Sequence, residues 1–198
     1  MAVADEQYFT LVYSSLQKFS GLSEADFKLL SPYFEIRSFG KKEVIAPAGV
    51  VDDYLNMVVQ GLVRKYIPVR NREVTIQLAT EGHLIQSEIS FHQRIPSEVV
   101  IETIEPTILV SMHYRNVQEA LQKLPFGEAL GRIIISYMFI KKDDRSYRQL
   151  KYNTRERFLD FIKTNPHMLQ RVPQKILASY LNIEPETFSR LKHLVARK

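Results

Sequence analysis

A long block of short β-type segments, flanked on both sides by helical patterns, constrains the fold of this chain most strongly. Between residues 34 and 112 the sequence forms β-rich runs such as "YLNMVVQG", "LVRKYIPV" and "EVTIQLA". Glycines, prolines and Asn or Asp residues separate these runs at short intervals. Several short strands at such spacing predict a barrel, a roll or a sandwich.

Helical spacing of apolar residues precedes and follows this block. The first 32 residues fit two helices, with Ser23 as the N-cap of the second. After residue 113 a helix over "RNVQEALQKL" precedes a longer helical stretch over residues 127–163, with a break expected near 150–154. Its early part is apolar on nearly every side, as in a helix that packs on the roll and on a second copy. A buried helix of a monomer is the alternative.

The sequence therefore predicts an α+β chain in three parts. These are a part with the β-rich runs over 1–125, a long helix over 126–150 and a helical part over 151–198.

The positive charge of the chain is concentrated in the last of these parts. Residues 1–150 hold 17 Lys and Arg and 18 Asp and Glu, a net charge of −1, whereas residues 151–198 hold 10 and 4, a net charge of +6. Affinity for nucleic acids rests largely on neutralised phosphates. A basic segment attached to a nearly neutral body is typical of a module that binds a polyanion.

Several other classes of protein are disfavoured. The 198 residues include no cysteine, which excludes disulfides, thiolate nucleophiles and Cys-ligated zinc or iron–sulfur clusters. No apolar run approaches the length of a membrane span and the N-terminus lacks a signal-peptide pattern, so we expect a cytoplasmic protein without a membrane partner. The five histidines lack metal-ligand spacing, and no phosphate loop or Ser-His-Asp order appears. We expect no enzyme activity, catalytic residue, metal ion, haem or other cofactor.

The segment "QKILASYLNIEPETFSRLKHL", residues 174–194, has the pattern of two short helices joined by a tight turn. Ala178 falls where two crossing helices leave no room for a larger side chain. Asn182 falls where the turn requires a positive φ, which Asn tolerates. Pro185 suits the first turn of the second helix. The apolar residues that would face the first helix are Ile183, Phe188 and Leu191. This spacing predicts a helix-turn-helix, and an ordinary helical hairpin is the alternative.

With the apolar face fixed, a polar mixture is left on the outer side of the second helix. In a helix-turn-helix this surface enters the major groove of DNA. Arg190 can donate two bonds to guanine and Glu186 can accept from cytosine N4, whereas Lys and Ser can hold phosphates. The predicted DNA-binding residues are Glu186, Arg190, Thr187, Ser189, Lys192, Gln174 and Lys175.

The whole chain resembles the CRP/FNR family of transcription regulators over residues 20–194. Two stretches carry the resemblance, "KKEVIAPAGVVDDYLNMVVQGLVRKYI" in the predicted roll and "RERFLDFIKTNPHMLQRVPQKILASYLNIEPETFSRLKH", which is similar to the Bacteroidetes branch. The resemblance implies a cyclic-nucleotide-binding-type β-roll sensor domain (a double-stranded β-helix or jelly roll) over 1–125. It also implies a long dimerisation helix over 126–150 and a C-terminal helix-turn-helix DNA-binding domain over 151–198. Glu186 and Arg190 match the family's base-contacting Glu and Arg.

The sequence departs from the family at the cyclic nucleotide site. Family members that bind cyclic AMP hold its phosphate with a Gly-Glu pair and an Arg-Ser pair, which favour an anion. Here Ser87-Glu88 and Pro96-Ser97 stand at those positions, and Arg94 lies two residues away, in a loop. Without a matched Arg we do not expect cyclic AMP to bind. The candidate effector pocket consists of Ser87, Glu88, Arg94, Pro96 and Ser97.

A second departure concerns the C-terminal end. The sequence stops at Lys198, shortly after the second helix, so we expect a helix-turn-helix domain without a full wing. Lys192, Arg197 and Lys198 would replace part of the phosphate contacts of the wing. The sequence thus predicts a homodimeric transcription regulator that binds double-stranded DNA, with an unidentified small-molecule effector and RNA polymerase as further partners. The alternative is a small-molecule-binding roll whose helical end makes protein contacts.

Overall fold

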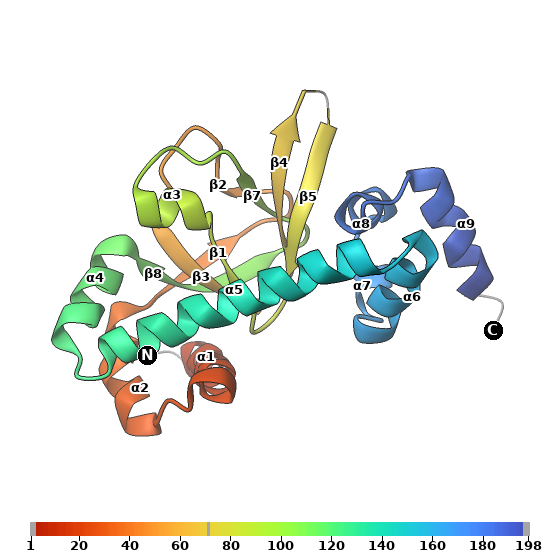
Figure 1. The fold of residues 1–198 in the computed structure, drawn as a ribbon. Helices are drawn as coiled ribbons and strands as arrows, with labels where there is room; N and C mark the ends of the chain where they lie inside the picture. The colour runs from red at the N-terminus through yellow and green to blue at the C-terminus, as the bar shows by residue number, and fades with distance from the viewer. Residues whose placement is uncertain (1–2, 71, 196–198) are drawn as a thin grey trace.

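The computed structural model describes residues 3–70 and 72–195 and contains a β-roll, a long helix and a helical C-terminal domain (Figure 1). The strands that it defines are β1 (Glu35–Phe39), β2 (Val44–Ala46), β3 (Tyr54–Gln60), β4 (Val63–Val69), β5 (Arg72–Ala79), β6 (Leu84–Ile85), β7 (Val100–Thr103) and β8 (Thr107–His113). Its helices are α1 (Val3–Ser20), α2 (Glu24–Leu30), a 3-10 turn (Ser31–Tyr33), α3 (Glu88–Gln93), α4 (Tyr114–Lys123), α5 (Gly127–Lys151), α6 (Thr154–Thr164), α7 (Met168–Arg171), α8 (Gln174–Leu181) and α9 (Pro185–Val195).

The roll consists of two four-stranded antiparallel sheets. One sheet has the strand order β1-β8-β3-β6, and the other has the order β2-β7-β4-β5. Small and branched apolar side chains such as Val58, Val63 and Ile101 fill the space between the sheets. The predicted β-roll and the α+β fold class are confirmed. Strand β6 and helix α3 were not predicted, because two and six residues carry too little periodicity.

Helices cover the outer face of the first sheet. Alternate residues of β3 and β8 point to this face, and they pack against α1, α4 and the first half of α5. Helix α1 contacts α5 directly, where the rings of Phe19 and Tyr137 stack with their centroids 4.1 Å apart. Ser23 caps α2 as predicted, by accepting a hydrogen bond from the Asp26 amide at 3.1 Å.

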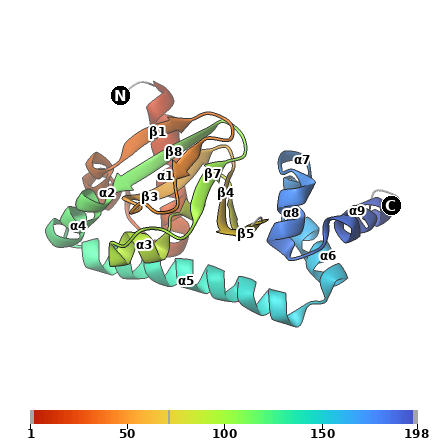
Figure 2. The ribbon, with the colours of Figure 1, turned by 90° about the horizontal axis from the view of Figure 1, so that it is seen from above.

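Helix α5 extends beyond the roll and ends beside the C-terminal domain (Figure 2). The predicted break in the helical stretch lies at Tyr152 and Asn153. Asn153 starts α6 with a capping box. The Asn153 side chain accepts a hydrogen bond from the Glu156 backbone amide, and the Glu156 carboxylate accepts one from the Asn153 backbone amide. In the C-terminal domain, buried residues of α6, α7, α8 and α9 share one core, at whose centre the rings of Phe158 and Phe188 meet edge to face at 5.2 Å.

Candidate functional site

Helices α8 and α9 form the bihelical turn that the spacing predicts. Asn182 has φ 53° and ends α8, where the Ile183 amide donates to the Ala178 carbonyl at 2.9 Å and the Asn182 amide donates to the Ser179 carbonyl at 3.1 Å. These two bonds form a Schellman motif, which satisfies the last carbonyls of the helix. Ala178 is buried against the neighbouring helices, and α9 begins at Pro185 as expected.

The predicted DNA-binding residues lie on the side of this unit that the core leaves free. Glu186 and Arg190 are exposed and lie one turn apart on α9, and the Arg190 guanidinium donates to the Thr187 hydroxyl at 3.2 Å. Within the described part of the chain, no hydrogen bond or ion pair involves the Glu186 side chain. Gln174 and Lys175 are exposed at the start of α8, whereas Ser189 and Lys192 are half-buried on the flanks of α9. Arg197 and Lys198 lie outside the described residues.

The candidate effector pocket is only partly brought together in the roll. The Ser97 hydroxyl donates to the Ser87 hydroxyl at 2.9 Å, and both residues are buried. The Ser87 amide donates to the Asp52 carboxylate at 2.7 Å, and burial raises the pKa of Asp52. Ser87 and Ser97 thus hold two loops together.

Glu88 is held by a residue that the sequence analysis missed. The Lys65 ammonium lies 2.7 Å from the Glu88 carboxylate and donates to the Gln86 carbonyl at 2.9 Å. The Lys65 side chain is 5% exposed and that of Glu88 is 39% exposed. Burial lowers the pKa of Lys65, and the charge of Glu88 opposes this shift. The only hint in the sequence is that two charged residues, Arg64 and Lys65, lie inside a strand whose other residues are mostly apolar.

Arg94 does not reach this pair. It ends α3 in the left-handed region, at φ 57°, and its guanidinium forms an ion pair with Asp53 and donates to the Asp52 carbonyl. The same guanidinium lies over the ring of Tyr114 at 4.0 Å. Pro96 is exposed. A phosphate at Ser87-Glu88 would therefore face the Glu88 carboxylate, with Arg94 already engaged elsewhere.

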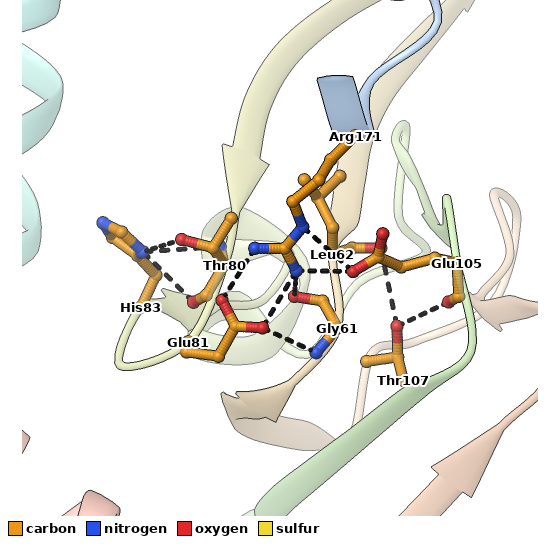
Figure 3. A network of polar contacts seen from close by, with 8 residues as sticks. All are labelled: Gly61, Leu62, Thr80, Glu81, His83, Glu105, Thr107 and Arg171. Atoms are coloured by element: carbon orange, nitrogen blue, oxygen red, sulfur yellow. Dashed lines mark hydrogen bonds and ion pairs between the residues drawn. The ribbon is translucent and has the colours of Figure 1, made fainter. Parts of the chain in front are cut away.

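A second polar cluster, absent from the predictions, joins the C-terminal domain to the roll. The guanidinium of Arg171, at the end of α7, lies between the carboxylates of Glu81 and Glu105 (Figure 3). It donates to Glu81 at 2.9 and 3.1 Å and to the Gly61 carbonyl at 2.9 Å. We call these four residues the Arg171 clasp. Its acceptors come from three separate turns at one end of the roll.

The turns themselves position the acceptors of the clasp. Gly61 has φ +101°, and a Cβ there would meet the Thr107 hydroxyl at 2.5 Å, so only glycine fits. The Gly61 amide donates to Glu81 at 2.9 Å. Burial raises the pKa of Glu81, but the bonds from Arg171 and the backbone amides outweigh it and lower the pKa overall. The two carboxylates raise the pKa of Arg171.

Helix α8 also docks on strand β5. The Ser179 hydroxyl accepts from the Thr75 amide at 2.9 Å and donates to the Glu73 carbonyl at 3.1 Å. Arg145 of α5 donates to the Ile76 carbonyl and, at 2.9 Å, to the Tyr180 carbonyl. The first helix of the bihelical unit therefore faces the roll, whereas α9 lies on the far side of the domain (Figures 1 and 2).

The described residues contain neither a candidate metal-ion site nor a candidate membrane-spanning helix. No group of three or more His, Asp or Glu residues in the described ranges could hold a metal ion. Likewise, none of the helices in these ranges is both long enough and apolar enough to cross a membrane.

The chain is similar to several solved regulator structures at low sequence identity. The catabolite activator protein of Thermus thermophilus is 20% identical, with 92% of this chain and 87% of that chain covered and a TM-score of 0.55. The c-di-GMP-responsive global regulator CLP of Xanthomonas campestris is 16% identical, with coverage of 88% and 93% and a TM-score of 0.65. A protein of Eubacterium rectale, described as a transcriptional regulator of the CRP/FNR family, is 17% identical, with coverage of 86% and 82% and a TM-score of 0.65.

No family model matches the sequence, and no curated protein matches it either. The structural likeness spans both the roll and the C-terminal domain, because more than four fifths of each chain is covered. The resemblance predicted from the sequence is thus confirmed at the level of the fold. This chain has the fold of the CRP/FNR transcription regulators.

Proposed function

We propose that this chain is a homodimeric transcription regulator that binds double-stranded DNA through α9. The observation that carries the proposal is the exposed pair Glu186 and Arg190 on the outer face of a bihelical unit whose inner face is fixed by buried apolar residues. The net charge of +6 after residue 150 supports it, since contacts to phosphates require cations. We expect this regulator to be located in the cytoplasm and to have RNA polymerase as a partner.

Pairing through α5 would explain its unpartnered apolar residues. Ile133, Ile140 and Tyr147 recur every seven residues on this helix, and Leu150 extends the stripe one turn further. Ile140 is 63% exposed and Leu150 is 87% exposed in the single chain. A repeat of seven is the spacing of a coiled-coil seam. The dimer would then present two copies of α9 to half-sites about 34 Å apart.

Dimer formation is tested by light scattering of the full chain and of the variant Ile140→Asp. The charge would lie in the seam and shift the protein towards the monomer, whereas Val50→Asp, at a site on the roll that is 55% exposed, would leave the mass unchanged. A wild-type mass of one chain at micromolar concentration would contradict the dimer.

We further propose that the roll does not bind cyclic AMP. The Lys65–Glu88 ion pair occupies the position at which a phosphate would need a cation, and Arg94 is paired with Asp53. A cyclic nucleotide would have to separate the first pair and face the Glu88 carboxylate. Calorimetry with cyclic AMP tests this point, and binding in the micromolar range would overturn it.

The decisive experiment is selection of bound sequences from a random DNA pool. We expect a two-fold symmetric consensus. On that site, Arg190→Ala should weaken binding by about 1–3 kcal/mol and relax the preference at one base pair of each half-site. The matched control is Arg115→Ala on α4, which removes the same charge from an exposed position at the opposite end of the molecule (Figure 1).

Two outcomes would contradict the proposal. If no sequence is enriched and the chain shows no salt-dependent retention on random DNA, it does not bind DNA, and a roll with a helical end for protein contacts is favoured instead. If a consensus appears but Arg190→Ala and Arg115→Ala bind it equally well, α9 does not read its bases through Arg190.

A further inference from the structure

An apolar cavity lies outside the roll, between its first sheet and the helices. Leu55 and Met57 of β3 and Met112 of β8 line one wall of it, and Leu130 and Met138 of α5 line the opposite wall. These strand residues alternate with those that fill the roll interior, so the cavity lies on the opposite face of the sheet from the space between the two sheets. It is distinct from the candidate effector pocket at Ser87 and Glu88.

The volume of the cavity is about 170 Å³. An apolar cavity of about 150 Å³ in another protein stays dry and binds benzene. The lining residues of α5 run from Gly127 to Met138, a length of roughly 16 Å at 1.5 Å per residue. The space therefore suits a small molecule of about six to ten non-hydrogen atoms.

The polar part of the lining is confined to three residues, Gln86, His92 and Gln118. Gln86 is 2% exposed, and its amide nitrogen lies 3.4 Å from His92 Nε2. Within residues 3–70 and 72–195, its Oε1 is buried and has no hydrogen-bond partner. An unsatisfied buried carbonyl costs about 1–3 kcal/mol. The Oε1 atom is itself closed to the cavity, so a ligand that donates a hydrogen bond would remove this cost only after the Gln86 side-chain amide rotates.

We propose that this cavity binds a small, uncharged, mainly apolar molecule that carries one hydrogen-bond donor. Its apolar body would fill the space between the sheet and α5, and its donor would bond to Gln86 Oε1 after the Gln86 side-chain amide rotates toward the cavity. His92 and Ile135 are exposed and mark where the cavity reaches the surface. A charged molecule is disfavoured, because almost all of the lining is apolar and no ionised carboxylate, Lys or Arg belongs to it.

Indole is a suitable probe, because it has nine non-hydrogen atoms and one N–H donor. The chain contains no tryptophan, so indole fluorescence excited beyond tyrosine absorption reports the probe alone. We expect a saturable blue shift of indole emission on titration of the full chain. The analogue 1-methylindole lacks the donor and should bind about tenfold more weakly.

Three variants make the assignment specific. Val117→Phe on α4 would place a ring in the cavity and abolish the shift, and Ile134→Phe on α5 provides a second filled cavity if the first variant unfolds. Val44→Phe, an exposed site on β2, is the matched control and should bind as the wild type does. Gln86→Met removes the acceptor, so indole and 1-methylindole should then bind equally well. Thermal melts confirm that each variant is folded.

The proposal fails if the wild type gives no saturable shift, or if folded Val117→Phe and Ile134→Phe bind indole as the wild type does. A wild type that binds indole and 1-methylindole with equal affinity would refute the role of Gln86. These measurements use the protein alone, so their result is independent of whether the chain binds DNA.

Discussion

Replacing Arg171 by Met should release the C-terminal domain from the roll without unfolding either part. The Arg171 guanidinium is the main polar link between α7 and the turns that hold Glu81, Glu105 and Gly61. Methionine keeps the apolar stem and removes every donor. The docked arrangement should therefore lose the energy of the clasp, whereas the substitution leaves unchanged the apolar contacts that Leu62, Leu78 and Ile104 of the roll make with the C-terminal core.

The size of the effect follows from the exposure of the clasp. The exposed fraction of the side chain is 27% for Arg171, 36% for Glu81 and 30% for Glu105. These fractions lie between those of an ion pair on the surface and those of a buried ion pair. A surface pair is worth about 0.2–1 kcal/mol, and a hydrogen bond to a charged group about 1.5–3 kcal/mol. With about 1 kcal/mol for each carboxylate and somewhat less for the Gly61 carbonyl, the loss is about 2–3 kcal/mol. The population of the undocked form would rise roughly 30- to 150-fold.

Hydrogen exchange of the Thr75 amide measures this population directly. That amide donates to Ser179 of α8, so its exchange requires α8 to leave β5. Its exchange rate should rise by the same factor in Arg171→Met, whereas the Val58 amide, bonded to the His83 carbonyl within the roll, should exchange as before.

Two comparisons complete the experiment. Arg155→Met, at an exposed position of α6, removes the same charge and should leave Thr75 protected. Arg171→Lys should restore part of the protection, because an ammonium reaches one carboxylate but cannot bridge two. If Thr75 exchanges within twofold of the wild-type rate in Arg171→Met, the clasp does not hold the domains together.

Three further predictions concern pH, the turn and the buried lysine. The pKa of Glu81 is lowered in the folded protein, so the stabilising contribution of its carboxylate is complete above pH 4.5, its ordinary pKa, and is lost as the pH falls through the lower pKa of the folded state. The urea concentration at the unfolding midpoint should therefore fall over that pH range in the wild type, and it should fall less in Arg171→Met. Asn182→Val should cost about 1–2 kcal/mol, because a β-branched residue does not tolerate φ 53°, whereas Asn182→Gly should be nearly neutral in a urea melt. Lys65→Met should change the free energy of unfolding by less than about 1 kcal/mol, because it removes the ion pair and also a costly buried charge. Glu88→Ala leaves the Lys65 ammonium without its carboxylate and should cost about 3 kcal/mol in the same urea melt. Equal losses in both variants would contradict this asymmetry.

The local features of the fold were predictable because neighbouring residues determine them. Asn182 and Pro185 mark the turn and the start of α9, since few residues adopt a positive φ and proline suits a first helical turn. The β-type runs identified seven of the eight strands in the described chain directly, because strand propensity and turn residues coincide there. The assignment of Glu186 and Arg190 as base-reading residues stays a prediction.

The long-range contacts could not be predicted in the same way. Arg171 lies 66 to 110 residues away from its acceptors Gly61, Glu81 and Glu105, and each acceptor sits in a different turn. No periodicity brings such residues together, because only the closed roll places the three turns at one end. Similarly, the charged residues within β4 do not indicate that the Lys65 side chain meets Glu88.

The stacking of Phe19 on Tyr137 has a consequence for synthesis of the chain on the ribosome. The two rings are separated by 118 residues, so α1 emerges long before the helix on which it packs. At about 5–20 residues per second, roughly 6–24 s pass between the synthesis of the two aromatic residues. During that interval Val12, Leu16 and Phe19 lack the α5 part of their final packing surface. The nascent N-terminal helix therefore keeps these apolar side chains partly uncovered, and it reaches its final packing only after the whole roll has been made.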